Sequence, residues 1–295
     1  MSNYFYLGGK RKKMKKALIL GVLLFLTTMV LAPLPGRAFN SATHIYISNR
    51  VHPFTFDKIN LYYGSIAPDI SLYVIPPEDW PDSFWETHYD VIVLPYAWWR
   101  PTQKAFAKGW QTHNEIWGAD LYAHGPYPDY DGYVNIQAGR LVDIFDVLSS
   151  PQGFELAHFA IEVAIDLLLV RYHDPSLGLK LLWAAKFRSS EDLNLLVEAF
   201  VGDGKLGLQT LLAAESTFRD LVIDYATALT LPDPLRMIVL GQFGASLAAE
   251  MGVSVTPAEV QWILRVAMYL CKDSNYMETI QSAIKGIRMH PDLIR

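Results

Sequence analysis

The chain has 295 residues, of which 51% are hydrophobic and 19% charged, a composition that supplies a large core and excludes a disordered protein. Its single cysteine, Cys271, cannot form an internal disulfide, which excludes disulfide scaffolds and cysteine-based zinc ribbons. The formal net charge of −5 is unevenly distributed: the first 38 residues carry seven Lys or Arg and no acid, and the rest has a net charge of −12. This acidic remainder argues against a nucleic acid as partner, because phosphate binding needs basic surface.

The first 38 residues are typical of an export signal. Basic residues within 10–16 precede an apolar stretch at 17–32, which has the length of a signal-peptide core. Small residues at Gly36 and Ala38 fit a cleavage site, so we expect a signal peptide at 1–38 and a secreted or periplasmic chain that begins at Phe39. The alternative is an uncleaved segment that anchors the protein to the membrane.

The remaining sequence predicts an all-α fold. From Phe39 to Arg100, prolines and glycines interrupt short apolar segments, which indicates short helices joined by long loops. Beyond Pro101 the apolar residues recur at spacings of three and four, which is typical of amphipathic helices. The predicted helices are 104–124, 154–172, 176–187, 191–201, 206–229, 234–251 and 256–271.

Five of the eight histidines lie in order with acidic residues that can share metal ions with them. On a helix, residues four apart project from one face and lie about 6 Å apart along the axis, so His158 and Glu162 can bind one ion, and Asp120 and His124 have the same spacing. His113 precedes Asp120 by seven residues, about 10 Å on an ideal helix. A break in the helix near Gly118 would bring that pair together.

The other three histidines, His52, His173 and His290, have no carboxylate at a ligand-like spacing on a helix face. We assign them ordinary structural roles, because an isolated histidine is more often a hydrogen-bonded core residue than a metal ligand.

Taken in order, these motifs resemble the zinc-dependent phospholipase C family and, more distantly, the single-strand-specific zinc nucleases of the same all-helical fold. The resemblance covers residues 39–172 and depends on Thr43-His44, on Gly64-Ser65-Ile66-Ala67-Pro68-Asp69, on Gly109-Trp110 followed by His113, and on Asp120, His124, His158 and Glu162. It implies a multi-helix bundle with a catalytic domain at 39–175. Residues 176–295, which match no motif of that family, are predicted to be additional C-terminal helices of unassigned role.

The resemblance implies up to three zinc ions. The first would be held by Asp69, His88, His113 and Asp120. The second would be held by His124, His158 and Glu162. The third would be held by His44, by Asp120 as a bridge, and by the amine and carbonyl of Phe39 once the signal is removed. One departure is the spacing from His113 to Asp120, which is seven here and usually four in the family.

The resemblance also implies a phosphodiesterase that cleaves phospholipids. Paired metal ions lower the pKa of a shared water, which can then attack phosphorus, and Asp69 is the candidate catalytic residue that orients this water. Seven aromatic residues between Trp80 and Trp99 could contact a membrane surface or instead pack over the cleft. The alternatives are hydrolysis of another phosphodiester, such as nucleic acid or a glycolipid anchor, and a catalytically silent metal-binding envelope protein.

Overall fold

In the computed structural model the described residues are 40–75, 77–89, 96–97, 100–127, 129–202 and 204–294. The predicted export signal and Phe39 lie outside them. Within these ranges the chain is helical and contains no strand, which confirms the all-α fold class. None of the described helices combines the length and the hydropathy that a membrane crossing requires.

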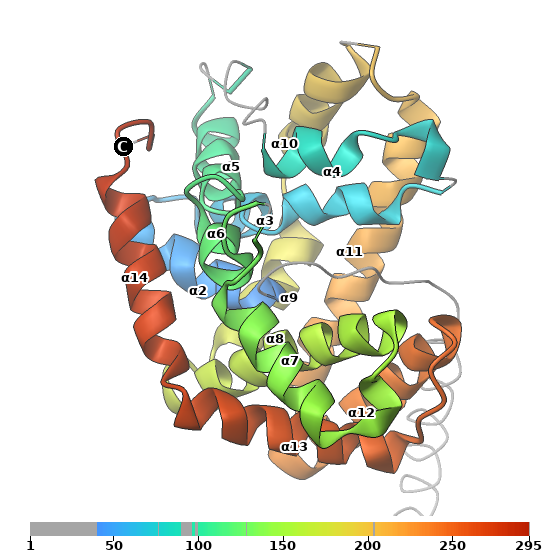
Figure 1. Ribbon diagram of the computed structural model, residues 1–295. Helices are drawn as coiled ribbons and strands as arrows, with labels where there is room; N and C mark the ends of the chain where they lie inside the picture. Colours follow the sequence, from blue (N-terminus) through green and yellow to red (C-terminus); the bar gives the residue numbers. More distant parts are fainter. Residues whose placement is uncertain are drawn as a thin grey trace, which may run out of the picture. The chain divides into compact units, whose positions relative to one another are not determined.

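The helices follow one another along the chain as shown in Figure 1. They are α2 (Ser41–Val51), α3 (Lys58–Gly64), η1 (Ala67–Tyr73), η2 (Pro77–Asp79), α4 (Ser83–His88), α5 (Pro101–Gln111), α6 (Ala119–His124), α7 (Tyr133–Ile144), η3 (Asp146–Leu148), α8 (Pro151–Tyr172), α9 (Leu177–Phe187), α10 (Ser190–Leu196), the π-helical η4 (Val197–Val201), α11 (Leu208–Thr230), α12 (Asp233–Glu250), α13 (Pro257–Asp273) and α14 (Tyr276–Met289).

One predicted helix is wrong. Residues 104–124 form two helices, α5 and α6, because the chain leaves the helical path from Thr112 to Gly118. From residue 151 onward the predicted helices agree with α8 to α13, and two helices, α7 and α14, were not predicted. Several of the long helices begin where the sequence offers both a cap and a proline. Ser150 accepts a hydrogen bond from Gly153 N ahead of Pro151, and Thr256 forms a capping box with Glu259 ahead of Pro257.

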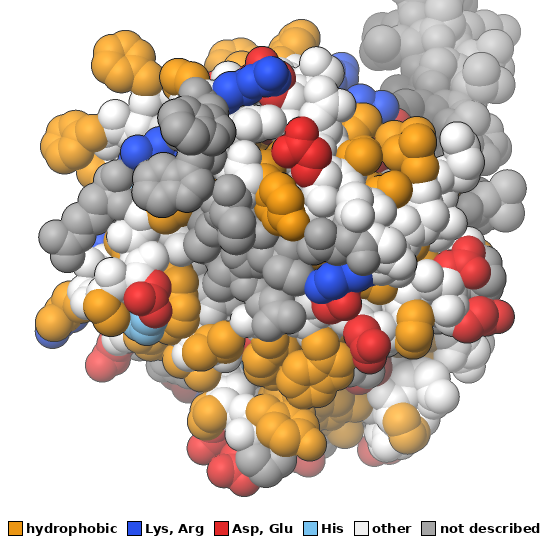
Figure 2. All heavy atoms as spheres, turned by 90° about the horizontal axis from the view of Figure 1, so that it is seen from above, with side chains coloured by type: hydrophobic (Ala, Val, Ile, Leu, Met, Phe, Trp, Pro, Cys, Tyr) orange, Lys and Arg blue, Asp and Glu red, His pale blue; other side chains and the backbone are white. Residues whose placement is uncertain are grey.

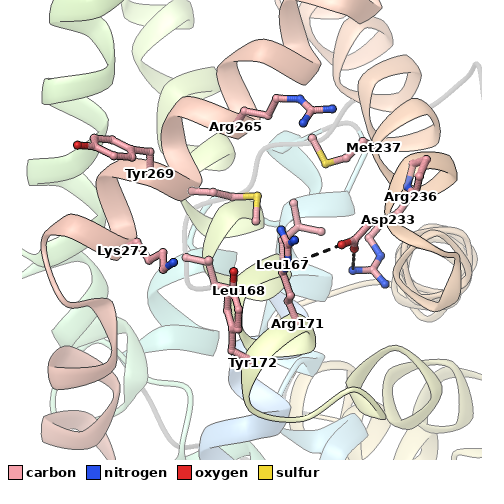
Figure 3. A pocket seen from close by; sticks show the side chains of 12 residues that line it. Leu167, Leu168, Arg171, Tyr172, Asp233, Arg236, Met237, Arg265, Tyr269 and Lys272 are labelled. Atoms are coloured by element: carbon pink, nitrogen blue, oxygen red, sulfur yellow. Dashed lines mark hydrogen bonds and ion pairs between the residues drawn. The ribbon is translucent and has the colours of Figure 1, made fainter.

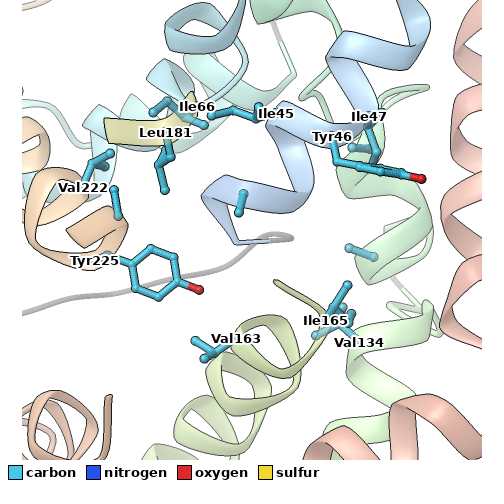
Figure 4. Close-up of a cluster of buried hydrophobic side chains, with 14 of the residues drawn as sticks. Ile45, Tyr46, Ile47, Ile66, Val134, Val163, Ile165, Leu181, Val222 and Tyr225 are labelled. Carbon is cyan, nitrogen blue, oxygen red and sulfur yellow. The ribbon is translucent and has the colours of Figure 1, made fainter. Parts of the chain in front are cut away.

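Helix α8 lies in the middle of the packing. It contacts α7, α13 and α2, and nearly all of its residues from Leu156 to Val170 are buried. Figure 4 shows part of the core between these elements, where Val163 and Ile165 of α8 lie near side chains of α2, α7 and α11. Helices α9 and α11 pack against α3 and η1, so the ranges 39–175 and 176–295 contribute to the same compact unit, Pro33–Arg295.

A buried carboxylate fixes the start of α2 against α8. Asp166 of α8 accepts hydrogen bonds from the backbone N–H of Ala42 (3.1 Å) and Thr43 (2.7 Å), from the Thr43 hydroxyl (2.6 Å) and from the Tyr225 hydroxyl (2.9 Å). Since α2 carries His44 and α8 carries His158 and Glu162, this contact sets the two helices that carry these predicted ligands against each other.

Candidate metal centre

Four predicted ligands from four separate segments meet around one nitrogen atom. His113 Nε2 lies 3.3 Å from His88 Nε2, 3.4 Å from Asp69 Oδ1 and 3.1 Å from Asp120 Oδ2, and His88 Nε2 lies 3.5 Å from Asp69 Oδ1. In a tetrahedral zinc site with ligands at 2.0–2.1 Å, neighbouring ligand atoms are about 3.3 Å apart. The three distances among Asp69, His88 and His113 match the edges of one face of such a site, and Asp120 approaches it through His113. Two facing imidazole nitrogens at this distance are typical of ligands that share an ion.

His113 and Asp120 approach each other because the chain between α5 and α6 forms a closed loop. At its base, Ala119 N donates to Thr112 O (2.8 Å) and Asp120 N donates to His113 O (3.1 Å). Inside it, the side-chain oxygen of Asn114 accepts hydrogen bonds from three successive N–H groups, those of residues 116–118. A Cβ on Gly118 would lie 2.4 Å from Asn114 N, so only glycine fits there. This loop is the helix break near Gly118 that the seven-residue spacing between His113 and Asp120 predicted.

Gly109, which precedes His113 in the predicted motif, allows α5 to pack closely on α3. A Cβ at this position would lie 2.0 Å from Leu61 O, so α5 packs directly on the backbone of α3. This packing brings His113 next to Ser65, which follows α3, and the Ser65 carbonyl oxygen contacts His113 Nδ1 at 2.8 Å.

His44 extends the cluster from the side of α2. Its Nε2 lies 3.3 Å from Asp120 Oδ1, and its ring stacks on that of His113 with centroids 4.0 Å apart. The two oxygens of Asp120 thus face different histidines, as expected of a bridging carboxylate. His44, His113 and Asp120 form one group that could hold an ion, and Asp69, His88 and His113 form another.

The second predicted set is also assembled. His124, His158 and Glu162 form a third group that could hold an ion, and all three side chains are buried. His158 Nε2 lies 2.9 Å from Glu162 Oε1 on adjacent turns of α8, and the rings of His124 and His158 are 5.2 Å apart. Because Asp120 and His124 lie one turn apart on α6, this third group adjoins the two groups that contain His113.

Four of the histidines have a protein oxygen atom within hydrogen-bond distance of Nδ1. That partner is Ser65 O for His113, Thr87 Oγ1 for His88, the Glu115 carboxylate at 2.6 Å for His124, and the Asn135 amide oxygen at 2.8 Å for His158. Metal-binding histidines usually show this arrangement, which fixes the ring and directs Nε2 toward the ion.

The pKa values of the two carboxylates beside His113, Asp69 and Asp120, are shifted in opposite directions. Burial, reinforced by the charges of Glu115, Asp69 and Glu162, raises the pKa of Asp120 well above its usual value. Burial also opposes ionisation of Asp69, but the neighbouring His113 and His88 outweigh it and lower the pKa of Asp69. Both oxygens of Asp120 are buried and accept no hydrogen bond within the described part of the chain. An uncompensated buried carboxylate is costly, and a bound cation would satisfy it.

The same environment keeps two histidines in the neutral form that binds metals. Burial lowers the pKa of His44, with a further contribution from His113, and burial also lowers the pKa of His88.

A cavity of about 410 Å³ opens beside His124 and His158, and its volume lies within the range of roughly 300–1,000 Å³ that is typical of small-ligand sites. Glu115, His124 and His158 form its polar wall. The remaining lining is largely apolar and comes from α4, α7, α8 and the loop before α7: Phe84, Tyr130, Asn135, Ile136, Phe154 and Glu155.

The aromatic residues between Trp80 and Trp99 divide between the two interpretations. Trp80 is buried against Phe200 and donates to Glu86 (2.7 Å), and Phe84 stacks on His88 with ring centroids 4.2 Å apart. Trp80 therefore packs in the core, and Phe84 packs over His88 of the site. Trp85 is half-exposed, and Trp98 and Trp99 lie outside the described residues.

Among the predicted ligands, only Phe39 lies outside the described residues, directly before Asn40, which caps α2. His52, His173 and His290 belong to none of the three groups found in the described part of the chain. The sequence reasoning missed Glu115, Asn135 and Ser65. Glu115 lies in the loop before α6 and Asn135 on an unpredicted helix, so neither shows a spacing that links it to a histidine. Comparisons with family models, curated proteins and solved structures find no match to this chain.

Proposed function

We propose that this protein is an exported zinc-dependent phosphodiester hydrolase that acts on phospholipids. The observation that supports it most strongly is the convergence of Asp69, His88 and His113 at distances that fit ligands of one zinc ion, with Asp120 and His44 on the other side of His113 and with His124, His158 and Glu162 as a third group. Zinc ions held there would act as Lewis acids on a phosphoryl group and lower the pKa of a water.

Asp69 suits the proposed catalytic role. Its side chain is 14% exposed, whereas those of His88, His113 and Asp120 are fully buried, so Asp69 is the member of the set that reaches solvent. Because His113 and His88 keep its pKa low, Asp69 is ionised at neutral pH and can accept a hydrogen bond from an attacking water and orient it.

Two surface properties favour a phospholipid over a nucleic acid. The cavity beside the second set has apolar walls, including Ile136, which is 52% exposed, and Phe154. Figure 2 shows one face of the molecule, on which exposed hydrophobic side chains lie among both acidic and basic ones. The chain beyond residue 38 has a net charge of −12, which disfavours a polyanion more than a lipid with an apolar body.

The experiment combines metal analysis with hydrolysis. We expect the purified protein that begins at Phe39 to contain about three zinc ions per chain and to hydrolyse a short-chain phosphatidylcholine, and we expect a chelator to abolish the hydrolysis. Asp69→Asn should reduce kcat at least about 100-fold, since it removes a ligand and the orienting carboxylate. Asp143→Asn, an exposed residue of α7, serves as the matched control.

Other outcomes discriminate against the proposal. Bound zinc without hydrolysis of any phosphodiester would favour a silent metal-binding protein. Faster hydrolysis of single-stranded nucleic acid than of phospholipid would assign the same site to a different substrate, and the absence of zinc would refute the metal centre.

A further inference from the structure

A second cavity lies at the far end of α8 from the metal centre. It has a volume of 380 Å³ and is formed by the end of α8, the start of α12 and the exposed face of α13. Arg171 follows His158 by 13 residues on α8, a separation of about 20 Å along the helix. Figure 3 shows the Arg171, Arg265 and Lys272 side chains extending from α8 and α13 into the space between the helices.

The cavity is rich in cations although the chain is acidic. Four basic residues line it with a single carboxylate, Asp233. Arg236 is already occupied, because it pairs with Asp233 at 3.0 Å and donates twice to Leu231 O. Arg171 approaches Asp233 only at 3.7 Å.

The other two basic residues, Arg265 and Lys272, form no ion pair among the described residues. They lie seven residues apart on α13, at a spacing that puts both on one helix face. With Asp233 matched by Arg236, the cavity holds up to three uncompensated positive charges, which favours an anion.

The rest of the lining is apolar and aromatic. Leu167 and Leu168 are buried, Met237 lies beside them, and the Tyr269 ring is 70% exposed. The Tyr172 ring lies between two cations, with Arg171 Cζ 5.5 Å and Lys272 Nζ 5.2 Å from its centroid, so the ring holds both positive groups at the cavity. A ligand that complements this lining carries a negative head on an apolar body.

We propose that this cavity binds an anionic amphiphile, an organic phosphate on an alkyl or acyl chain. The head lies against Arg171, Arg265 and Lys272, and the apolar chain lies along Leu168, Met237 and the tyrosine rings. The site is separate from the metal centre and does not depend on its proposed activity.

The test is a calorimetric titration of the zinc-containing full chain with octyl phosphate below its micellar concentration. Arg265→Gln together with Lys272→Gln should weaken binding at this site about tenfold or more, because two charge-assisted contacts are lost. Arg140→Gln together with Lys285→Gln removes two exposed cations from other helices and should leave the affinity unchanged. Any binding at the metal centre is common to both variants, so the difference between them reports on the cavity, and thermal unfolding checks that both are folded.

Equal affinity in the two double variants would overturn the proposal. Octyl glucoside binding as tightly as octyl phosphate would refute the role of the cations. Inorganic phosphate binding as tightly as octyl phosphate would refute the apolar subsite.

Discussion

At the scale of single residues, the centre depends as much on the oxygens behind the histidines as on the ligands themselves. His124 is the clearest case, because Glu115 contacts its Nδ1 at 2.6 Å from within the loop that also positions Asp120. The sequence predicted the candidate ligands, whose types and spacings are characteristic. It did not identify these supporting oxygens, because backbone carbonyls and loop side chains carry no recognisable pattern.

Glu115→Gln tests this support. The amide keeps the shape of Glu115 but removes its charge, so His124 should be a weaker ligand, and we expect zinc affinity at the second set to fall about 10–100-fold. Competition with a chromogenic chelator measures this change. Glu86→Gln, which alters a carboxylate paired with Lys205, is the control, and an unchanged affinity in Glu115→Gln would contradict the role assigned to Glu115.

Asp120→Asn should have opposite effects on the zinc-bound and metal-free proteins. Zinc binding should be lost with the bridging carboxylate. In the metal-free protein the buried charge opposes folding, because burial and three nearby carboxylates raise the pKa of Asp120. Its removal should therefore raise the melting temperature in chelator by about 2–4 °C per kcal/mol gained. A lower melting temperature than that of the metal-free wild type would contradict this electrostatic account.

At the scale of elements, helix positions followed from apolar spacing, whereas the course of the chain between helices did not. The range 104–124 has a continuous helical pattern, yet the hydrogen bonds of Asn114 and the required Gly118 interrupt it. Tertiary contacts decide such a case, since local propensity is a weak determinant. No helix was predicted for the range that forms α7, where Val134, Ala138 and Leu141 recur at helical spacing and are buried.

Asp192, at the start of α10, should make stability depend on pH. Burial, and to a lesser extent the charge of Asp57, raises the pKa of Asp192 to about 8, from an ordinary value near 3.8. The folded protein therefore holds a proton that the unfolded chain releases, so the free energy of unfolding should fall as the pH rises from about 4 to about 8, by up to about 1.4 kcal/mol per pH unit.

Asp192→Asn should remove this slope and make the protein more stable than the wild type at pH 8. Urea unfolding at pH 5, 6.5 and 8 measures the slope in both. The exposed Asp143→Asn is the control, and a slope that persists unchanged in Asp192→Asn would assign it to other groups.

At the scale of the whole molecule, one loop bears on the proposed action on phospholipids. Phe54 and Phe56, between α2 and α3, are 93% and 104% exposed, which is unusual for large apolar side chains. Lys58 and Lys108 lie close by. Lys58 Nζ donates to His52 O (2.8 Å), and burial, together with the charges of Lys108 and Lys58, lowers the pKa of His52 to about 4. Exposed aromatic rings among cations are typical of surfaces that bind anionic membranes.

Phe54→Ala together with Phe56→Ala should weaken binding to phosphatidylglycerol-containing vesicles at least about tenfold, because both rings lose a site in the lipid interface. Co-sedimentation measures the binding. Ile144→Ala together with Leu208→Ala, two exposed apolar residues on other helices, is the matched control. Equal binding by the two double variants would exclude this loop as the contact surface.

The closed loop between α5 and α6 also bears on how chains of this kind are recognised in genomes. The backbone hydrogen bonds at its base fix His113 and Asp120 to each other, so the number of residues between them can change without moving the two ligands. A search motif with a fixed count between histidine and aspartate overlooks such chains. A template written as side-chain positions in space retrieves them.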